Sequence, residues 1–264
     1  MRVASWNVNS IRTRLSQVIA WLNAQATQEP IDLLCLQETK VVDADFPSDE
    51  FTQLGYHVYV SGQKSYNGVA LISRDPIIDI QKGFTSVLGT EKVGSFDEQK
   101  RVIGGLIQGI RVINLYVPNG SEVGSDKYQY KLEWLDLLRE YLTYWLSKPD
   151  PLWICGDFNI APEDRDIYDP KKAGEIMASP PERDALAKIV GLGLQDVFRK
   201  FTTAGGYFSW WDYRSAAFVR NRGWRIDHHY LSQSLYERAS QCVIDRDPRS
   251  NPQPSDHAPV IATV

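Results

Sequence analysis

Cysteine is scarce in this sequence of 264 residues. The three cysteines, Cys35, Cys155 and Cys242, lie inside apolar runs. Their odd number and their spacing suit neither a disulfide framework nor a zinc site. We therefore expect each of them to be a reduced core residue.

Long apolar segments are also missing. The first ten residues, MRVASWNVNS, lack the apolar stretch of a signal peptide. No run approaches the roughly 20 apolar residues that are needed to cross a bilayer. We expect a soluble, cytoplasmic protein that makes no use of a membrane.

Excess positive charge is absent too. The net charge is -4, which weighs against a domain that is basic as a whole, as many nucleic-acid-binding domains are. Residues 213 to 225 differ from the rest because they hold four arginines and no acidic residue: Arg214, Arg220, Arg222 and Arg225. The sequence thus predicts a cationic island on an acidic protein.

The sequence also lacks segments that would mark a domain boundary. No Gly/Ser-rich or Pro-rich linker, fixed-period repeat, low-complexity segment or sustained charge block interrupts it, and 43% of its residues are hydrophobic. Strand-like runs continue to Val264. We expect one domain over residues 1–264 with a substantial core.

Short apolar runs alternate with helical patterns from the first residue, which indicates an α/β or mixed α+β fold. Two segments, Ile11 to Leu22 and Leu135 to Leu146, repeat apolar residues at helical spacing, with Asp126 near the start of the second helix and Pro149 beyond its end. The strand-like runs are Arg2 to Trp6, Ile31 to Leu36, Val102 to Ile107, Val112 to Val117 and Leu152 to Cys155.

Polar residues with catalytic capacity follow these apolar runs almost every time. Because strand ends and the loops after them present side chains for chemistry, we expect the segments to converge on one rim of a sheet. The residues concerned are Asn7, Gln37, Glu38, Asn119, Asp157, Asn159, Asp227, Ser255, Asp256 and His257.

Each of these residues also has an ordinary structural explanation. Glu38 suits the first solvated position beyond a strand, and Asp157 with Asn159 suits an Asx turn. His257 suits a satisfied, partly buried histidine, and Asp227 suits an ion pair with the nearby Arg225.

The combination favours chemistry over these separate explanations. Carboxylate and amide oxygens are the ligands of a hard cation such as Mg²⁺, which needs only one or two acids. A further carboxylate orients or deprotonates water, and cationic groups stabilise the charge that builds on a phosphate. The residues therefore predict metal-assisted hydrolysis of a phosphodiester.

The chain resembles the exonuclease III type of abasic-site endonucleases in the endonuclease/exonuclease/phosphatase superfamily. Eight segments carry the resemblance in family order from residue 5 to residue 259: SWNVNSIR, LQETK, NGVALIS, YVPNG, GDFNIAP, FSWWDYR, GWRID and SDHAP. The resemblance implies a four-layered α/β sandwich, in which helices flank two packed mixed β-sheets, with the site at one edge.

It also implies roles for individual residues. Glu38 matches the principal metal ligand, with Asn7, Asn9 and Asp256 near the metal and its waters. The implied catalytic residues are Asp157 and Asn159 for the attacking water, His257 and Asp227 for the scissile phosphate, and Tyr116 for the phosphate or leaving group. Arg101 and Asn119 match contacts near the DNA phosphates.

An aromatic and basic segment supports DNA as the substrate. Trp210, Trp211, Phe218 and Trp224 are interleaved with the arginines of residues 213 to 225, so we expect stacking surfaces beside cations that pair with phosphates, including Arg214, Arg220 and Arg222. Core aromatics with solvated arginines are the structural alternative. In relatives, the positions of Trp210, Trp224 and Ile226 form an apolar pocket for an extruded sugar without its base.

Two positions depart from the family pattern. Some relatives carry Asp at Asn9, which leaves a second metal open, and some place a DNA-contacting Asn at Asp169, in a loop of residues 163 to 182 that matches loosely.

The resemblance implies a monomeric DNA repair nuclease that uses Mg²⁺, with Mn²⁺ as a substitute. Its substrates would be duplex DNA with abasic sites or with recessed or blocked 3′ ends, and hydrolysis would fall 5′ to the abasic site. Three alternatives stay open: a 3′-5′ exonuclease, a phosphatase or phosphodiesterase of the same fold that acts on a non-DNA substrate, and a lesion-binding module without catalysis.

Overall fold

The computed structural model describes residues 1–264 and contains twelve strands. They are β1 (Arg2–Asn7), β2 (Leu33–Gln37), β3 (His57–Ser61), β4 (Val69–Ser73), β5 (Ile78–Lys82), β6 (Val102–Ile107), β7 (Ile110–Tyr116), β8 (Leu152–Asp157), β9 (Leu194–Asp196), β10 (Asp227–Ser232), β11 (Gln241–Ile244) and β12 (Val260–Thr263). They form two six-stranded sheets, in the orders β11-β12-β1-β2-β4-β3 and β5-β6-β7-β8-β10-β9. Each sheet is mixed, because β1 runs parallel to β2, and β7 to β8, among otherwise antiparallel pairs.

Helices and short 3₁₀ turns connect the strands. The helices are α1 (Ile11–Ala26), α2 (Ser48–Thr52), α3 (Thr85–Leu88), α4 (Thr90–Val93), α5 (Asp126–Leu146), α6 (Pro180–Val190), α7 (Val197–Phe201) and α8 (Gln233–Arg238). The 3₁₀ turns are η1 (Asp43–Asp45), η2 (Phe96–Glu98), η3 (Asp164–Asp166), η4 (Pro170–Lys172) and η5 (Asp247–Ser250). None of the helices combines the length and the apolar character that crossing a bilayer requires.

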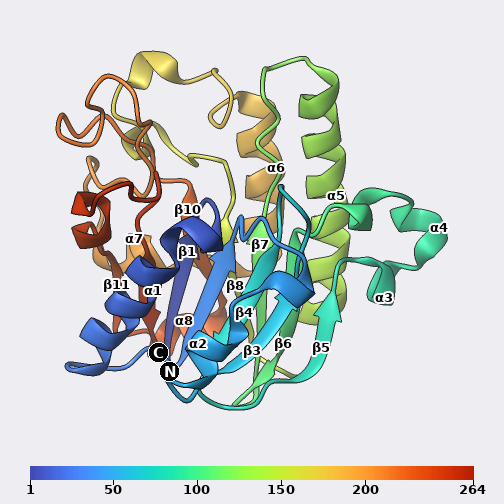
Figure 1. Cartoon of the computed structure of the whole chain (residues 1–264). Coiled ribbons are helices and arrows are strands. Elements are labelled where there is room, and N and C mark those ends of the chain that lie inside the picture. The colour runs from blue at the N-terminus through green and yellow to red at the C-terminus, as the bar shows by residue number, and fades with distance from the viewer.

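Three apolar cores hold the layers together. Trp21 and Phe51 lie in the core that joins α1 and α2 to the first sheet, and Trp134 lies in the core that joins α5 and α6 to the second sheet. Val3 and Trp153 belong to the core between the two sheets. Figure 1 shows α5 and α6 on one side of the strands and α1 and α2 on the other, so the predicted four-layered sandwich is confirmed.

The predicted elements agree with this fold. The helix expected from Ile11 is α1, and the helix expected near Asp126 begins there, where the side chain of Ser125 accepts a hydrogen bond from the backbone N–H of Tyr128. The five strand-like runs correspond to β1, β2, β6, β7 and β8, with ends displaced by up to two residues. Cys35, Cys155 and Cys242 are buried and free, as predicted.

A neutral histidine is built into the core between the two sheets. His229 in β10 is fully buried; its Nδ1 accepts from Trp153 Nε1 at 2.9 Å, and its Nε2 lies 2.9 Å from the carbonyl oxygen of Val260, to which it donates. Protonation would turn Nδ1 into a second donor facing the indole N–H. Burial lowers the pKa of His229 to about 4.

This histidine should make the fold sensitive to acid. Between pH 6.5 and 4 the unfolded chain binds a proton at His229 that the folded chain does not, so stability falls as pH falls. The expected loss is about 3 kcal/mol across that window. We expect His229→Gln, which keeps one acceptor and one donor, to remove this loss in urea titrations at pH 7, 5.5 and 4. Parallel pH profiles for the variant and the wild type would contradict the assignment.

Candidate active site

Polar side chains from both sheets meet at one end of the sandwich. Asn7 ends β1, Glu38 follows β2, and Asp157 ends β8. Asp227 begins the antiparallel β10 and lies opposite Asp157 in the register. Because His257 in the loop before β12 joins them, the predicted convergence of separate segments on one rim is confirmed.

The backbone at this rim is unusual. Asn9, Glu38 and Asn159 have positive φ angles of 45°, 51° and 50°, a region that non-glycine residues seldom occupy. At Gly156, directly before Asp157, φ is 144° and a Cβ atom would lie 1.9 Å from the carbonyl oxygen of Leu115. Such local strain gathers where a fold holds side chains for function.

Asn7 bridges two carboxylates at the centre of the cluster. Its Nδ2 donates to Glu38 Oε1 at 2.9 Å and to Asp157 Oδ2 at 2.9 Å. Lys40 Nζ lies 2.9 Å from the second oxygen of Glu38. Burial alone would raise the pKa of Glu38, but Lys40 and the Asn7 hydrogen bond outweigh it and lower that pKa. Glu38 is therefore an anion at neutral pH.

His257 lies between two buried carboxylates. Its Nδ1 donates to Asp227, at 2.9 and 3.1 Å from the two oxygens, and its Nε2 lies 3.8 Å from Asp157 Oδ2. Burial by itself would lower the pKa of His257, but Asp227 and Asp157 raise it to about 10. The ring is an imidazolium at neutral pH. The predicted alternative, in which Asp227 pairs with Arg225, is wrong.

Asp157 is surrounded by amide donors. It accepts from the backbone N–H of Asn159 at 2.9 Å and from Asn159 Nδ2 at 3.2 Å, so the expected Asx turn also exists. Asn119 Nδ2 in turn donates to Asn159 Oδ1 at 3.0 Å. Burial raises the pKa of Asp157 above its ordinary value. This raised pKa is closer to the pKa that an effective general base needs near neutral pH.

Tyr116 and Arg101 border the cluster on the side of the second sheet. The guanidinium of Arg101 lies over the Tyr116 ring, 4.5 Å from its centroid, and donates to the Tyr116 carbonyl oxygen at 3.2 Å. Burial, followed by the negative charge of Glu38, raises the pKa of Tyr116 well above its usual range. The phenol therefore keeps its proton and is a hydrogen-bond donor.

Asp256 and Asn9 form the opposite border. Asp256 accepts from Trp210 Nε1 at 2.9 Å and from Asn9 Nδ2 at 3.0 Å. Burial would raise the pKa of Asp256, but His257 and these two donors outweigh it and lower that pKa. Asp256 is therefore ionised, and it connects the cluster to the tryptophan beside it.

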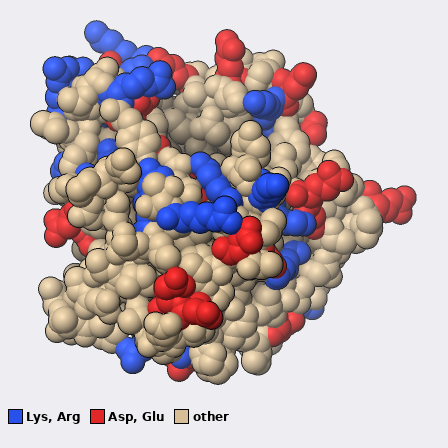
Figure 2. Space-filling view, viewed as in Figure 1, with Lys and Arg blue, Asp and Glu red and all other residues tan.

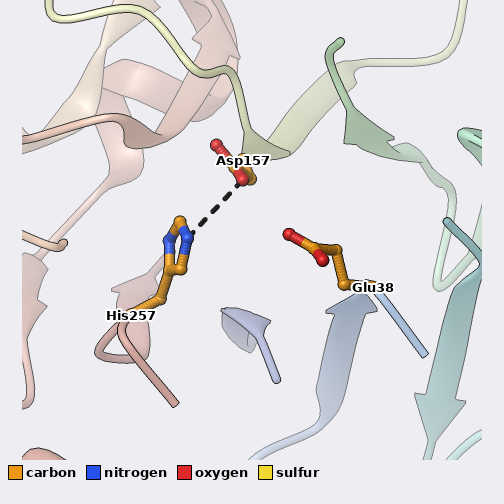
Figure 3. Close-up of side chains that lie close together, drawn as sticks. All are labelled: Glu38, Asp157 and His257. Carbon is orange, nitrogen blue, oxygen red and sulfur yellow. Dashed lines mark ion pairs between the residues drawn. The ribbon is translucent and has the colours of Figure 1, made fainter. Parts of the chain in front are cut away.

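The cluster has the composition of a metal site. Ligand atoms of Glu38, Asp157 and His257 lie within 4.8 Å of one another, and Figure 3 shows the three side chains pointing toward a common space. Since the His257 ring is protonated, the carboxylates are the available ligands, and their oxygen atoms suit a hard divalent cation. The Lys40 ammonium already lies against Glu38, which shows that this carboxylate attracts positive charge. The residues present fit a metal.

A cavity of about 460 Å³ opens beside this cluster. Trp210 and Trp224 line it together with Ile176 and Met177. Ile226, the third predicted pocket residue, packs in one apolar cluster with Trp210 and Trp224. It does not line the cavity, because it is only 1% exposed. Because Trp210 also bonds Asp256, one wall of the cavity is fixed to the catalytic cluster.

Only some arginines of the predicted cationic segment lie at the surface. Arg214 and Arg222 line the cavity and Arg220 is exposed, but Arg225 is buried and paired with Asp166 and Asp196. The expectation that Arg225 faces a phosphate is therefore wrong.

Trp211 corrects the stacking prediction for the same segment. It is 0% exposed and packs edge-on against Phe218, so it is a core residue. Figure 2 shows Lys and Arg side chains together with Asp and Glu side chains around a hollow in the upper part of the face drawn there.

Two charged residues at the site escaped the sequence interpretation. Lys40, the partner of Glu38, stands only two residues after it in the LQETK segment. Lys131 is buried on α5 and donates to the carbonyl oxygen of Asn159. Its signal was present, because position 131 falls on the apolar stripe of Leu135, Leu138 and Leu142 at helical spacing.

Comparison with known proteins identifies the family. The family model described as the endonuclease/exonuclease/phosphatase family matches residues 4–257. Exodeoxyribonuclease III of Haemophilus influenzae is 38% identical over 275 residues, which cover 99% of each chain.

Solved structures agree. A 3′ phosphatase from Neisseria bound to a product DNA hairpin superposes with a TM-score of 0.92 and 38% identity, over 100% of this chain and 98% of that one. An abasic-site (AP) endonuclease from Archaeoglobus fulgidus gives 0.91 and 40%, over the same shares. The chain thus belongs to the endonuclease/exonuclease/phosphatase family, as a metal-dependent DNA repair nuclease of the exodeoxyribonuclease III and AP endonuclease type.

Proposed function

We propose that the protein is a Mg²⁺-dependent nuclease that hydrolyses the phosphodiester 5′ to an abasic site in duplex DNA. The observation that carries this proposal is the 460 Å³ cavity, which is walled by Trp210 and Trp224 and fixed to the catalytic cluster through Asp256. A sugar without its base loses little stacking when it leaves the duplex, so a cavity with two tryptophans in its wall next to a phosphodiesterase site would favour that lesion.

Asp157 and Asn159 would serve the attacking water. The carboxylate of Asp157 would accept a proton from water as its oxygen attacks phosphorus, and Asn159, which donates to that carboxylate, would hold the geometry. The bond from phosphorus to the 3′ oxygen of the preceding nucleotide would break as the water oxygen bonds to phosphorus. The leaving oxygen would take up a proton from Tyr116 or from solvent, which leaves a 3′-hydroxyl and a 5′-phosphate on the abasic residue.

His257, Tyr116 and Arg101 would stabilise the negative charge that develops on the phosphate and on the leaving oxygen. Asp227 binds the His257 imidazolium at Nδ1. The Nε2–H group on the other side of the ring could therefore donate to a phosphate oxygen. The phenol of Tyr116 can donate a hydrogen bond to the phosphate or the leaving oxygen. When bound, Mg²⁺, for which Mn²⁺ would substitute, would supply positive charge against the negative charge that develops on the phosphate and on the leaving oxygen.

Processing of 3′ ends is the second candidate activity. Lys172, Arg214 and Arg222 line the same cavity and would meet a terminal phosphate. Their charge is partly offset, because Lys172 pairs with Glu175 and Arg214 with Asp212. The 3′ phosphatase from Neisseria has the same fold and is 38% identical to this chain.

A labelled duplex with one tetrahydrofuran abasic analogue tests the proposal, beside an intact duplex and duplexes with recessed or 3′-phosphorylated ends. We expect incision 5′ to the analogue with Mg²⁺ and none with EDTA. Shortening from the 3′ end without incision would replace the first activity by the second. If the protein cleaves none of these substrates, both proposed activities are wrong.

Glu38→Gln should weaken binding of the metal rather than binding of DNA. The amide keeps the shape of the side chain but loses the negative charge that attracts a cation. We expect the Mg²⁺ concentration for half-maximal incision to rise at least about tenfold. Titration of Mg²⁺ at saturating DNA measures this, with Glu29→Gln on the surface as the control. An unchanged Mg²⁺ requirement would remove Glu38 from the proposed metal site.

A further inference from the structure

A lysine without solvent contact lies behind the catalytic loops. Lys131 on α5 is 0% exposed, and all the partners of its ammonium are protein oxygens. It donates to the carbonyl oxygen of Asn159 at 2.8 Å, to that of Asn119 at 3.1 Å, and to the carboxylate of Glu182 on α6. An ammonium has three N–H donors, so each of them is used.

Glu182 extends this contact to the cavity. Its Oε1 also accepts from the backbone N–H of Met177 at 3.1 Å, and its Oε2 accepts from the backbone N–H of Ser179 at 3.0 Å and from its hydroxyl at 2.6 Å. Met177 lines the cavity, and its carbonyl oxygen accepts from the N–H of Ala161 at 2.7 Å. One buried ion pair thus holds backbone atoms of three loops that border the site.

Glu182 also forms the N-terminal capping box of α6 with Ser179, but that role does not require a charged partner at position 131. Removing an ammonium and a carboxylate from water is costly, and well-packed uncharged residues often replace buried ion pairs at no loss of stability. A charged pair does supply direction, because several hydrogen bonds with fixed geometry converge on it. Its partners here are backbone groups of the loops that carry Asn119 and Asn159, whose side chains are also bonded to one another.

We propose that Lys131 and Glu182 are positioning residues that set the Asn159 and Asn119 loops against the wall of the cavity. This inference rests on the proposed role of Asp157 and Asn159 in holding the attacking water. Asn159 receives Lys131 at its carbonyl oxygen and donates to Asp157 through its backbone N–H and its side chain. A shift of this loop therefore moves the groups that hold the water, without removing any of them.

If Lys131 and Glu182 position the loops, their replacement should slow incision but leave DNA binding intact. A displacement of about 1 Å caused by a residue away from the chemistry can cost about 10²-fold in rate. We therefore expect the double variant Lys131→Met/Glu182→Gln to incise an abasic duplex about 10²-fold more slowly in single turnovers. Its Kd for the uncleaved duplex in EDTA should change by less than about threefold, because the exposed side chains that face phosphates are untouched. The double variant leaves no unpaired buried charge.

A matched control separates positioning from general destabilisation. Leu138→Ala removes a fully buried apolar side chain from the same helix and leaves the Lys131–Glu182 pair and its hydrogen bonds to the three loops in place. Both variants and the single variant Glu182→Gln are compared with the wild type for melting temperature, Kd and single-turnover rate, well below every melting temperature. Glu182→Gln keeps an acceptor for Ser179 and leaves Lys131 bonded to the carbonyl oxygens of Asn159 and Asn119, so it should give an intermediate loss of rate. Because the buried ammonium of Lys131 then lacks its counter-charge, this variant should have a lower melting temperature than the double variant.

Two results would overturn the inference. One is a rate within about threefold of the wild type for the double variant. The other is a loss of rate in Leu138→Ala as large as in the double variant at a similar fall in melting temperature. The same ratios are measured on a recessed 3′ end. If the wild type shortens that end but leaves the abasic duplex intact, the proposed lesion specificity fails, while the ratio on the 3′ end still tests the positioning role.

Discussion

Asp157→Asn should reduce incision of an abasic duplex by about 10²–10⁴-fold, the range of a lost general base. Asparagine has the shape of aspartate but cannot accept a proton from water. It also presents an NH₂ group where both oxygens of Asp157 act as acceptors, toward Asn7 Nδ2 and two N–H groups of Asn159. One hydrogen bond of the cluster is therefore lost together with the base.

DNA binding should survive this change. Removing a negative charge near the phosphate cannot weaken attraction to the duplex, so we expect an unchanged or lower Kd in EDTA. Single-turnover incision at saturating enzyme measures the chemical step, and fluorescence anisotropy measures Kd. Asp164→Asn is the matched control, because that carboxylate is exposed and pairs only with Arg183. A turnover within tenfold of the wild type would remove Asp157 from the role of base.

The sequence predicted the helices and central strands because these elements carry a strong periodic or continuous apolar signal. In α5, for example, Leu135, Leu138 and Leu142 form one buried stripe. The edge strands were harder. In β5 three of five side chains are exposed and in β11 two of four, and both strands are short, so neither has a long apolar run.

The site residues could be predicted because most of them follow a buried strand, and strand ends meet at the same edge. The contacts between them could not. Asn7 and Asp157 are 150 positions apart, and only the packing of two sheets places the amide of one between two carboxylates. The pairing of His257 with Asp227 likewise needs β10 and the loop before β12 to be adjacent.

The errors concern Trp211 and Arg225, which the sequence places in an exposed aromatic and basic segment. Alternation of such residues does not tell which of them face inward. Arg225 is drawn into the interior by Asp166 and Asp196, which lie 59 and 29 positions away, and by His228, whose Nδ1 lies 3.0 Å from its guanidinium. A buried arginine requires such partners, and the two carboxylates are not visible in the local sequence.

His257→Ala should reduce incision by about 10²–10³-fold, the usual cost of losing a group that stabilises developing charge. The imidazolium is the cation that Asp227 holds within 3.8 Å of Asp157, and alanine leaves that charge unreplaced. Asp227→Asn should cost less, because the ring remains and the amide oxygen can still accept from Nδ1–H. Single-turnover incision at saturating Mg²⁺ measures both losses.

The two substitutions should not be additive. If Asp227 acts only by orienting and charging His257, its replacement has no further effect once the imidazole is absent, so the double variant should match His257→Ala. His229→Gln, in the same strand as Asp227 but in the core between the two sheets, controls for disturbance of β10. Additive losses would mean that Asp227 touches the substrate or the metal itself. A double variant as slow as His257→Ala alone would leave Asp227 as a group that works through the histidine.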